Sequence, residues 1–360
     1  MHHSWPTSSL SGIRRLRLAS TDRFAGAARR GLGACFASLA LVMLLAGCTL
    51  GTSPNIDATT QVGAFGSNPG NLRMYKYVPA KLPPSPAMVV ALHHCFQHAN
   101  DYLEEAGWRI LADRYGFIVL LPEQPASNEI NLCFNWYSSA EWRGKGEGES
   151  IHQMVEKMAA DYQIDRSRVF VTGLSSGASM AMVLLATYPE VFAGGGEIGG
   201  APFGCARTLL DVPLCQTIGP IDTPQAWGNL VRAASPHHGP WPIVSVWHGN
   251  LDVIAAPNDA KAIVQQWTNV HGIPDTPTRQ EKVEGYPRLV YADSSGRAVV
   301  EYYQMIGMGH SVPMDPHRGC GDGRQGFGNF VSDMHICSSL YMLKFWGLAG
   351  ADDSMTPPGS

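Results

Sequence analysis

Short, mostly apolar runs recur along the chain, each with the length of a buried β-strand. They span residues 87–92, 117–121, 168–172, 192–198 and 243–247. A strand that is covered on both faces of a sheet is apolar at nearly every position rather than at alternate positions. These runs therefore predict strands of a sheet that carries helices on both faces.

Segments with a helical pattern separate these runs. Between residues 150 and 162, apolar side chains recur three and four positions apart, which places them on one face of a helix. Asp101 and Glu104 are typical of the start of another helix, which extends to about residue 115. Further helices are predicted at residues 176–187, 258–270 and 334–346.

The alternation of strands and helices predicts the fold class and the domain organisation. It is typical of an α/β fold with a mostly parallel, doubly wound sheet. We expect one large domain at residues 71–348. A polar tether at residues 48–70 precedes it, and a frayed tail at residues 349–360 follows it.

The first 47 residues have a different character from the rest of the chain. Six arginines precede a short apolar run at residues 39–46, which is too short to span a bilayer. This order of segments is typical of an export signal. The four residues that end at Cys48 (LAGC) resemble a bacterial lipobox, so we expect residues 1–47 to be removed and Cys48 to be lipidated. A plain secretory signal is the alternative, and paired arginines leave twin-arginine export open.

Composition argues for export and against nucleic-acid binding. The net charge is −4 and charged residues make up only 16% of the chain, so there is no basic excess for a polyanion. Of the eight cysteines, Cys35 leaves with the signal and Cys48 carries the lipid, which leaves six. In an oxidising compartment these predict three disulfides, for which 15 pairings are possible. No C-x-x-C motif is present, so no zinc ribbon is predicted.

The central chemical signal is the pentapeptide GLSSG at residues 173–177. It follows a predicted strand and opens a predicted helix, which is the context of the G-x-S-x-G nucleophile elbow. Small flanking residues are needed because the serine sits on a tight turn. We assign Ser175 as the nucleophile, with Ser176 as the alternative that lacks the flanking symmetry.

A serine nucleophile needs a base, and the base needs an acid that orients it. In folds of this kind the acid follows the nucleophile in the chain and lies at the carboxyl end of a strand. Asp252 comes shortly after the strand at residues 243–247, and we assign it as the acid. Asp259 is the alternative, although its place near a helix start is typical of a capping residue.

The base should lie in a loop before the last helix. His310 follows the turn Gly307-Met308-Gly309, whose glycines allow the backbone to present the imidazole. We assign His310 as the base. The weaker alternatives are His248, His317 and His335.

The oxyanion that forms during acyl transfer needs hydrogen-bond donors. One donor should be the backbone N–H of the residue after the nucleophile, Ser176. The second should come from the loop after residues 87–92, and we assign it to the N–H of Cys95. His93 and His94 in this loop are adjacent, so their rings are not expected to face one ion, and no metal or cofactor is predicted.

Together, five motifs resemble the polyhydroxybutyrate depolymerase family of esterases, which also includes feruloyl and acetylxylan esterases. The motifs are LHHCFQ at residues 92–97, NLCFNWY at 131–137, GLSSGA at 173–178, HGNLD at 248–252 and GMGH at 307–310. The likeness extends from about residue 70 to about residue 348. It implies an α/β-hydrolase fold, a triad of Ser175, Asp252 and His310, and secreted, cofactor-free hydrolysis of carboxylic esters.

The resemblance also carries expectations for single residues. The chain has His94 where the family usually has glycine, so we expect His94 to narrow the acyl site or to contact substrate. Trp136 is expected either to line the acyl pocket or to pack in the core. The motifs suggest the disulfides Cys95–Cys133, Cys205–Cys215 and Cys320–Cys337.

These features predict an exported serine esterase for short acyl or hydroxyacid esters of the 3-hydroxybutyrate type. A feruloyl or acetylxylan esterase is the alternative activity, and a serine peptidase or a non-catalytic envelope lipoprotein are alternatives of other kinds. We expect soluble esters to be preferred over solid polymer, because only about fourteen residues follow Trp346, too few for a polymer-binding module. The expected partners are the ester substrate and, through the lipid on Cys48 alone, a membrane. The sequence leaves the oligomeric state open.

Overall fold

The computed structural model describes residues 59–219, 222–321 and 330–355. The chain divides into two compact units, residues 1–55 and 56–360, and the described residues all belong to the second. The predicted export signal, Cys35 and Cys48 lie outside the described residues, so these assignments stay predictions. Within the described ranges, no helix combines the length and the apolar composition that a bilayer crossing requires.

In the described residues, ten strands form one sheet in the order β1-β2-β4-β3-β5-β6-β7-β10-β9-β8. The strands are β1 Thr60–Val62, β2 Arg73–Tyr77, β3 Met88–Leu92, β4 Ile118–Glu123, β5 Val169–Leu174, β6 Gly194–Ile198, β7 Ile243–Gly249, β8 Arg279–Val283, β9 Tyr286–Ala292 and β10 Ala298–Met305. Neighbours from β4 to β10 are parallel, and the flanking strands are antiparallel. The carboxyl ends of β4, β3, β5, β6, β7 and β10 therefore meet at one edge, which we call the carboxyl edge.

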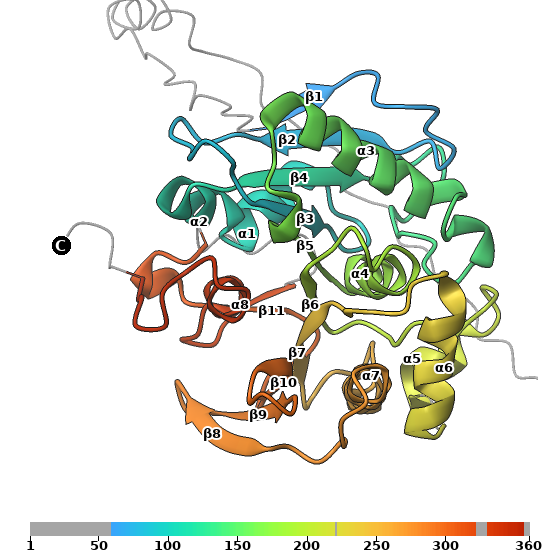
Figure 1. Cartoon of the computed structure of the whole chain (residues 1–360), viewed down its shortest axis with the longest axis vertical. Coiled ribbons are helices and arrows are strands. Elements are labelled where there is room, and N and C mark those ends of the chain that lie inside the picture. Colours follow the sequence, from blue (N-terminus) through green and yellow to red (C-terminus); the bar gives the residue numbers. More distant parts are fainter. Residues whose placement is uncertain (1–58, 220–221, 322–329, 356–360) are drawn as a thin grey trace, which may run out of the picture. The chain divides into compact units, whose positions relative to one another are not determined.

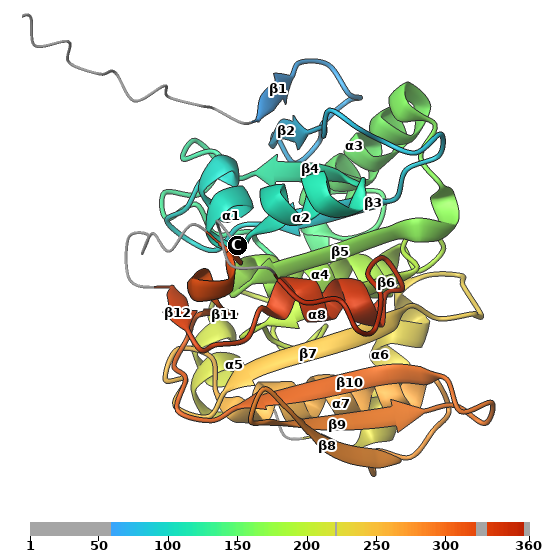
Figure 2. The ribbon, with the colours of Figure 1, turned by 90° about the vertical axis from the view of Figure 1, so that its left-hand side faces the viewer.

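Helices cover both faces of this sheet (Figure 1). One face carries α1 Ala99–Glu105, α2 Trp108–Tyr115 and α8 Ser338–Phe345, which lie in front of the strands in Figure 2. The other face carries α3 Gly146–Tyr162, α4 Ser176–Thr187, α6 Pro224–Ala234 and α7 Pro257–Val270. The remaining elements are α5 Val212–Ile218, the paired strands β11 Val312–Met314 and β12 Val331–Asp333, and the 3-10 helices η1 Ser139–Glu141, η2 Arg166–Arg168 and η3 Pro316–Arg318.

The core has two layers because side chains of a strand alternate between the faces of the sheet. In β3, Met88, Val90 and Leu92 join the apolar cluster beneath α3, α4 and α7. Val89 and Ala91 join the cluster beneath α1, α2 and α8. All five side chains are buried, which explains why β3 is apolar at consecutive positions. Burial of one Val, Leu or Met side chain contributes about 1.5–3 kcal/mol.

One helix predicted from the sequence is two helices in the structure. The expected helix from Asp101 to about residue 115 is wrong, because α1 ends at Glu105 and α2 begins at Trp108. Gly107 between them has φ 71, a left-handed conformation that interrupts the helix and that glycine adopts without strain. The apolar pattern continues across this break, so periodicity alone does not show it.

The domain extends further at both ends than the sequence predicted. β1 lies within the predicted tether, yet it pairs with β2, with Thr60 opposite Lys76. Three mostly polar residues at a sheet edge carry no apolar signal, which is why β1 was missed. Met355 lies in the predicted tail, yet it is buried in the cluster beneath α8.

The three predicted disulfides are confirmed. Cys95–Cys133 joins the loops that follow β3 and β4, and Cys205–Cys215 closes a short segment that includes part of α5. Cys320–Cys337 joins the segment after β11 to the N-cap residue of α8. Each bond closes a loop of the unfolded chain, which for loops of this size stabilises the folded state by about 2–4 kcal/mol.

The strand–turn–helix unit of β5, Ser175 and α4 lies at the centre of the parallel part of the sheet. A mostly parallel sheet with helices on both faces and a serine at this turn is the α/β-hydrolase fold. The sequence predicted this fold class correctly.

Candidate active site

Ser175 lies on a strained turn at the carboxyl edge. Its φ of 58 and ψ of −120 lie outside the regions that non-glycine residues usually adopt, and its N–H donates to Ile198 O over 3.0 Å. A Cβ atom on Gly173 or Gly177 would collide with the carbonyl oxygen of Leu92. The pentapeptide therefore needs glycine at both positions, because the turn packs directly against the end of β3.

His310 and Asp252 form a close pair. His310 Nδ1 donates to Asp252 Oδ2 over 2.7 Å, and both side chains are almost fully buried. Asp252 Oδ1 accepts the N–H groups of Ile254 and Ala255, each at 2.9 Å, which fix the carboxylate. Among the described residues, His310 Nε2 has no hydrogen-bond partner although it is buried. This nitrogen is therefore free to accept a proton.

Gly199 connects this pair to the serine turn. It follows Ile198, whose carbonyl accepts from Ser175, and its N–H donates to Trp247 O over 3.0 Å. A Cβ on Gly199 would lie 3.1 Å from His310 Nδ1 and 3.3 Å from Asp252 Oδ2. The ends of β5, β6 and β7 thus bring Ser175, Asp252 and His310 into one small region.

The pair has the charge distribution that a general base requires. Burial raises the pKa of Asp252, but the hydrogen bond and positive charge of His310 outweigh burial and hold the pKa below its ordinary value. Asp252 is therefore ionised near neutral pH. An ionised acceptor keeps the proton of His310 on Nδ1 and leaves Nε2 as the acceptor.

The other histidines that the sequence left open are placed differently. His248 is buried and Nε2 donates to Ala255 O over 2.9 Å, while its distance to Asp252 Oδ2 is 3.5 Å. His317 and His335 are exposed and pair with Asp333 instead. The nitrogens of these two histidines and an oxygen of Asp333 lie within 4.8 Å of one another, so this group could hold a metal ion. None of its members contacts the His310–Asp252 pair in the described interactions.

Two further buried carboxyl groups, those of Glu197 and Asp259, lie near Asp252. The sequence did not predict that they would be neighbours of Asp252. Glu197 Oε2 accepts the N–H of Gly200 over 2.7 Å, while Glu197 Oε1 and both oxygens of Asp259 have no hydrogen-bond partner among the described residues. Burial, followed by the charges of the neighbouring carboxylates, raises the pKa of each to about 8. Asp259 does not cap α7, whose start carries no side-chain cap bond, and it does not bind His310.

Replacing Asp259 by asparagine should remove a pH-dependent loss of stability. The folded protein keeps the Asp259 proton up to about pH 8, whereas the unfolded chain releases it near its ordinary pKa of about 3.9. The stabilisation is complete below the unfolded value and is lost as the pH rises through the folded value, at about 1.4 kcal/mol per pH unit. The melting temperature of Asp259→Asn relative to wild type should therefore rise by several degrees between pH 5 and pH 8.5.

The exposed residue Asp211 is the control for this measurement. The backbone N–H of Arg207 and the hydroxyl of Thr208 donate to Asp211 and lower its pKa, so Asp211 stays ionised at pH 5 and above. Asp211→Asn should therefore shift the melting temperature equally at both pH values. If the difference in melting temperature between Asp259→Asn and wild type were the same at both pH values, a protonated Asp259 in the folded protein would be contradicted.

The two residues that carry the predicted oxyanion donors have side chains in contact. Ser176 is the first residue of α4, where backbone N–H groups have no partner within the helix. Ser176 Oγ lies 3.4 Å from Cys95 Sγ, and the disulfide to Cys133 holds that loop. The next N–H, of Phe96, is already donated to Asn131 O over 2.6 Å. The N–H groups of Ser176 and Cys95 therefore remain the candidate donors.

His94 forms part of the wall of this site. Its ring is 4% exposed, and its Nδ1 bonds to the carbonyl of Cys95. The ring lies tilted against the Phe330 ring, with 4.4 Å between centroids. The Phe330 ring is also nearly perpendicular to the His310 ring, with 5.9 Å between their centroids. Burial, which outweighs the bond to Cys95, lowers the pKa of His94 to about 4. The ring of Phe330 therefore lies between a neutral His94 and the candidate base His310. The sequence did not identify Phe330.

Two other residues of the predicted motifs lie inside the protein. Trp136 is buried in the cluster beneath α3 and α4 together with Phe134, as a core residue would be. Its expected role in substrate binding stays a prediction. His93 is buried, and its Nε2 accepts the N–H of Gln124 over 3.1 Å, so it holds the loop rather than substrate.

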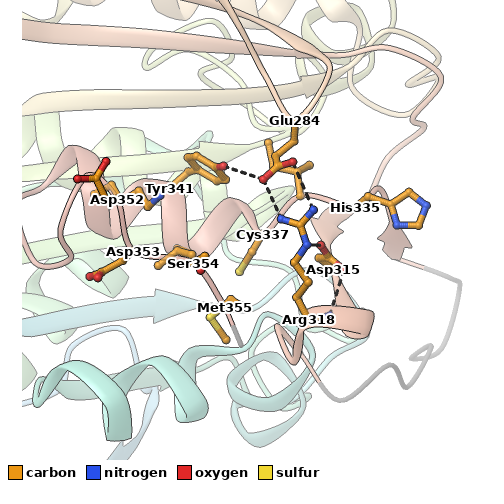
Figure 3. Close-up of a pocket in the computed structure, with 13 residues that line it drawn as sticks. Glu284, Asp315, Arg318, His335, Cys337, Tyr341, Asp352, Asp353, Ser354 and Met355 are labelled. Carbon is orange, nitrogen blue, oxygen red and sulfur yellow. Dashed lines mark hydrogen bonds and ion pairs between the residues drawn. The ribbon is translucent and has the colours of Figure 1, made fainter. Parts of the chain in front are cut away.

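A separate cavity of about 220 Å3 lies beside α8 (Figure 3). Arg318 pairs with Glu284 at 2.8 Å and with Asp315 at 3.1 Å, and Tyr341 donates to Glu284 over 3.3 Å. In Figure 3 the ring of His335 points away from these ion pairs. The lining includes none of the candidate catalytic side chains. The interactions join the turn between β8 and β9 to η3 and α8, which is a structural role.

Comparison with known proteins identifies relatives over most of the chain. The chain is 44% identical over 304 residues to poly(3-hydroxyalkanoate) depolymerase C of Paucimonas lemoignei, covering 83% of this chain and 72% of the relative. It is 36% identical over 266 residues to feruloyl esterase B of Talaromyces funiculosus, covering 71% of this chain and 74% of the relative. An acetylxylan esterase of Coprinopsis cinerea is 37% identical over 273 residues, with 72% and 71% covered.

A solved structure and a family model agree with these relatives. The structure of an acetyl xylan esterase from Aspergillus awamori superposes with a TM-score of 0.69 at 30% identity, covering 81% of this chain and 99% of that one. Residues 73–285 match the family model described as Esterase PHB depolymerase. The chain therefore belongs to the Esterase PHB depolymerase family of carboxylic ester hydrolases.

Proposed function

We propose that the chain hydrolyses esters of short acids or hydroxyacids through a Ser175–His310–Asp252 triad and an acyl-enzyme. The observation that carries the proposal is the 2.7 Å hydrogen bond from His310 to Asp252, in a ring whose Nε2 is buried without a partner among the described residues. The strained turn of Ser175 supports it further. This arrangement supports the roles of nucleophile for Ser175, base for His310 and orienting acid for Asp252.

The reaction has two halves. His310 Nε2 takes the proton of Ser175 as Oγ attacks the ester carbonyl carbon, and the N–H groups of Ser176 and Cys95 stabilise the oxyanion. The intermediate collapses as His310 gives the proton to the leaving alcohol, which leaves the acid bound to Ser175 as an ester. Water then attacks that ester with the same base, releasing the acid and restoring Ser175. Ionised Asp252 stabilises the imidazolium in each half.

The proposed substrate class is the hydroxyacid ester of the 3-hydroxybutyrate type. The depolymerase relative at 44% identity supports this class, as do the aliphatic side chains Leu251, Val253 and Ile254 on either side of Asp252. Feruloyl or acetylxylan ester hydrolysis is the second candidate, which the esterase relatives at 36–37% identity favour.

We also propose that the protein is exported, because three disulfides are stable in an oxidising compartment, and that Cys48 anchors it through lipid.

A comparison of soluble substrates tests this proposal. Turnover of 3-hydroxybutyrate dimers and trimers should exceed turnover of methyl ferulate and acetylated xylan oligosaccharides at least tenfold in kcat/KM. The variant Ser175→Ala serves as the blank for each substrate. Faster turnover of ferulate or acetylated xylan would transfer the assignment to the second candidate, and no Ser175-dependent turnover of any ester would contradict the triad.

A further inference from the structure

Three exposed side chains beside the β11–β12 pair bring metal-binding atoms together. In the part of the chain that the structure describes, His317, Asp333 and His335 are the one group of this kind whose ligand atoms all lie within 4.8 Å of one another. His317 lies in η3, which follows β11, and Asp333 is the last residue of β12. The group therefore combines residues from two separate segments and forms only when the chain folds.

The ligand atoms have separations that suit a tetrahedral ion. His317 Nε2 lies 2.8 Å from Asp333 Oδ2, and His335 Nδ1 lies 3.4 Å from Asp333 Oδ1. Ligands bound at about 2.0–2.2 Å around a tetrahedral ion are about 3.3–3.6 Å apart. The side chains of His317, Asp333 and His335 are 72%, 36% and 71% exposed, so they can rotate to this spacing and water can supply a fourth ligand.

Ion pairs alone explain this arrangement poorly. Both imidazoles approach a single carboxylate, and the ring centroids of His317 and His335 are 5.7 Å apart. Two imidazolium rings at this distance repel each other, and ion pairs that are this exposed contribute little to stability. A divalent metal ion instead attracts the carboxylate of Asp333 and binds both imidazoles in their neutral form.

The neighbouring cation has other partners. Arg318 follows His317 in the chain, and its guanidinium pairs with Glu284 at 2.8 Å and with Asp315 at 3.1 Å. The dashed lines in Figure 3 join Arg318 to both carboxylates, whereas the ring of His335 points away from them. The positive charge of Arg318 is therefore compensated by these two carboxylates beside the group.

The ligand atoms also select the kind of ion. Calcium and magnesium prefer oxygen ligands, and this group offers the oxygens of one carboxylate. Two imidazole nitrogens and a carboxylate suit zinc and the neighbouring transition metals. Zinc sites with three protein ligands hold water in the fourth position, which an exposed site supplies.

We propose that His317, Asp333 and His335 bind one zinc ion, which fastens η3 to the end of β12. The sequence predicted no metal, because the three residues form no recognised motif along the chain. None of them contacts the candidate catalytic residues in the described interactions, so the ion has a structural role.

The β11–β12 pair connects this ion to the candidate base. Each strand has three residues, and Met314 at the end of β11 lies opposite Asp333. At the other end of the pair, Ser311 and Ser332 share a hydrogen bond of 2.7 Å, and Ser311 follows His310. Zinc at one end therefore stabilises the short strands that hold the His310 loop at the other end.

Zinc binding is measured first, on the full chain after metal has been removed with EDTA. Isothermal titration calorimetry should show one bound zinc ion fewer per chain in His317→Gln/His335→Asn than in wild type. Asparagine is chosen at His335 because the residue has φ 53, which asparagine tolerates.

A matched variant controls for zinc bound elsewhere on the chain. His98→Gln/His238→Gln also removes two exposed histidines, both outside the group, and should bind zinc as wild type does. Circular dichroism shows whether each protein is folded. The same number of zinc ions, bound with the same affinity, in all three proteins would overturn the proposal.

The structural role is measured second. Saturating zinc should raise the melting temperature of wild type and of the control by several degrees, and that of His317→Gln/His335→Asn far less. Hydrogen exchange in peptides that contain residues 331–337 should slow with zinc in the first two proteins alone. Zinc binding that changes neither the melting temperature nor the exchange would overturn the structural role.

A competition with calcium tests the ligand assignment. Zinc should stay bound to wild type in a large molar excess of calcium, because imidazole nitrogen is a poor calcium ligand. Displacement of the zinc by calcium would contradict ligation by His317 and His335. None of these measurements uses ester hydrolysis, so an inactive wild-type protein would contradict the proposed function while the zinc result still stands.

Discussion

Ser175→Ala should lower kcat for p-nitrophenyl butyrate by a factor of about 10⁴ or more, with little change in the folded structure. Removal of the nucleophile from a serine triad leaves only the catalysis that binding and the oxyanion donors provide. Alanine has the same backbone requirements as serine at φ 58, so the turn and its hydrogen bond to Ile198 should persist. Initial rates at saturating ester, with circular dichroism of both proteins, provide the measurement.

The neighbouring serine is the matched control. Ser176→Ala keeps the backbone N–H that we assign to the oxyanion and removes only a hydroxyl that lies against Cys95 Sγ. Its kcat should stay within a few-fold of wild type. If Ser176→Ala were inactive and Ser175→Ala active, the nucleophile would be Ser176, the alternative that the pentapeptide left open.

Asp252→Asn should lower kcat by about 10³–10⁴ while leaving KM within a few-fold. The N–H groups of Ile254 and Ala255 would bind the oxygen of the new amide, which turns its NH2 group toward His310. His310 Nδ1 would then have to accept, so its proton would move to Nε2, where it blocks transfer from Ser175. Loss of the negative charge also removes stabilisation of the imidazolium.

Asp259→Asn separates this effect from a general change in the local charge. After burial and the charge of Glu197, the charge of Asp252 also raises the pKa of Asp259, yet Asp259 makes no hydrogen bond to His310. Its replacement should change kcat less than tenfold. A large loss in Asp259→Asn together with near-normal turnover in Asp252→Asn would reverse the assignment of the acid.

The parts of the site that the sequence predicted are those with strong local patterns. Ser175 lies between two glycines that the close packing of the turn requires, and His310 follows another glycine-containing turn. Such positions are recognisable because backbone geometry restricts the choice of residue. Asp252 was predicted as the acid because it follows the nucleophile in the chain and comes shortly after the end of a predicted strand.

The parts that were missed depend on long-range packing. Phe330 reaches His94 and His310 from a segment that has no pattern of its own, and the coupling of Glu197 to Asp259 depends on how β6 meets α7.

Parts of the fold were missed for related reasons. The edge strand β8 is polar at most positions, because it pairs on one side only and covers little of the core. α5 is seven residues long and contains Pro213 and Cys215, so it has too few positions to show a helical period. The Cys205–Cys215 disulfide and contacts with the start of α7 hold it in place instead.

The order of strands in the sheet also determines when activity can first arise during folding. The candidate site draws on residues between Cys95 and His310, and the strands that carry them are not neighbours in the order in which they are made. Contacts between such distant segments form slowly, because long loops must close before they are stabilised. Helix content should return early in refolding, whereas ester hydrolysis must wait until β10, which precedes His310, has paired with β7. The rate at which hydrolysis recovers therefore reports the rate of the last long-range step of folding.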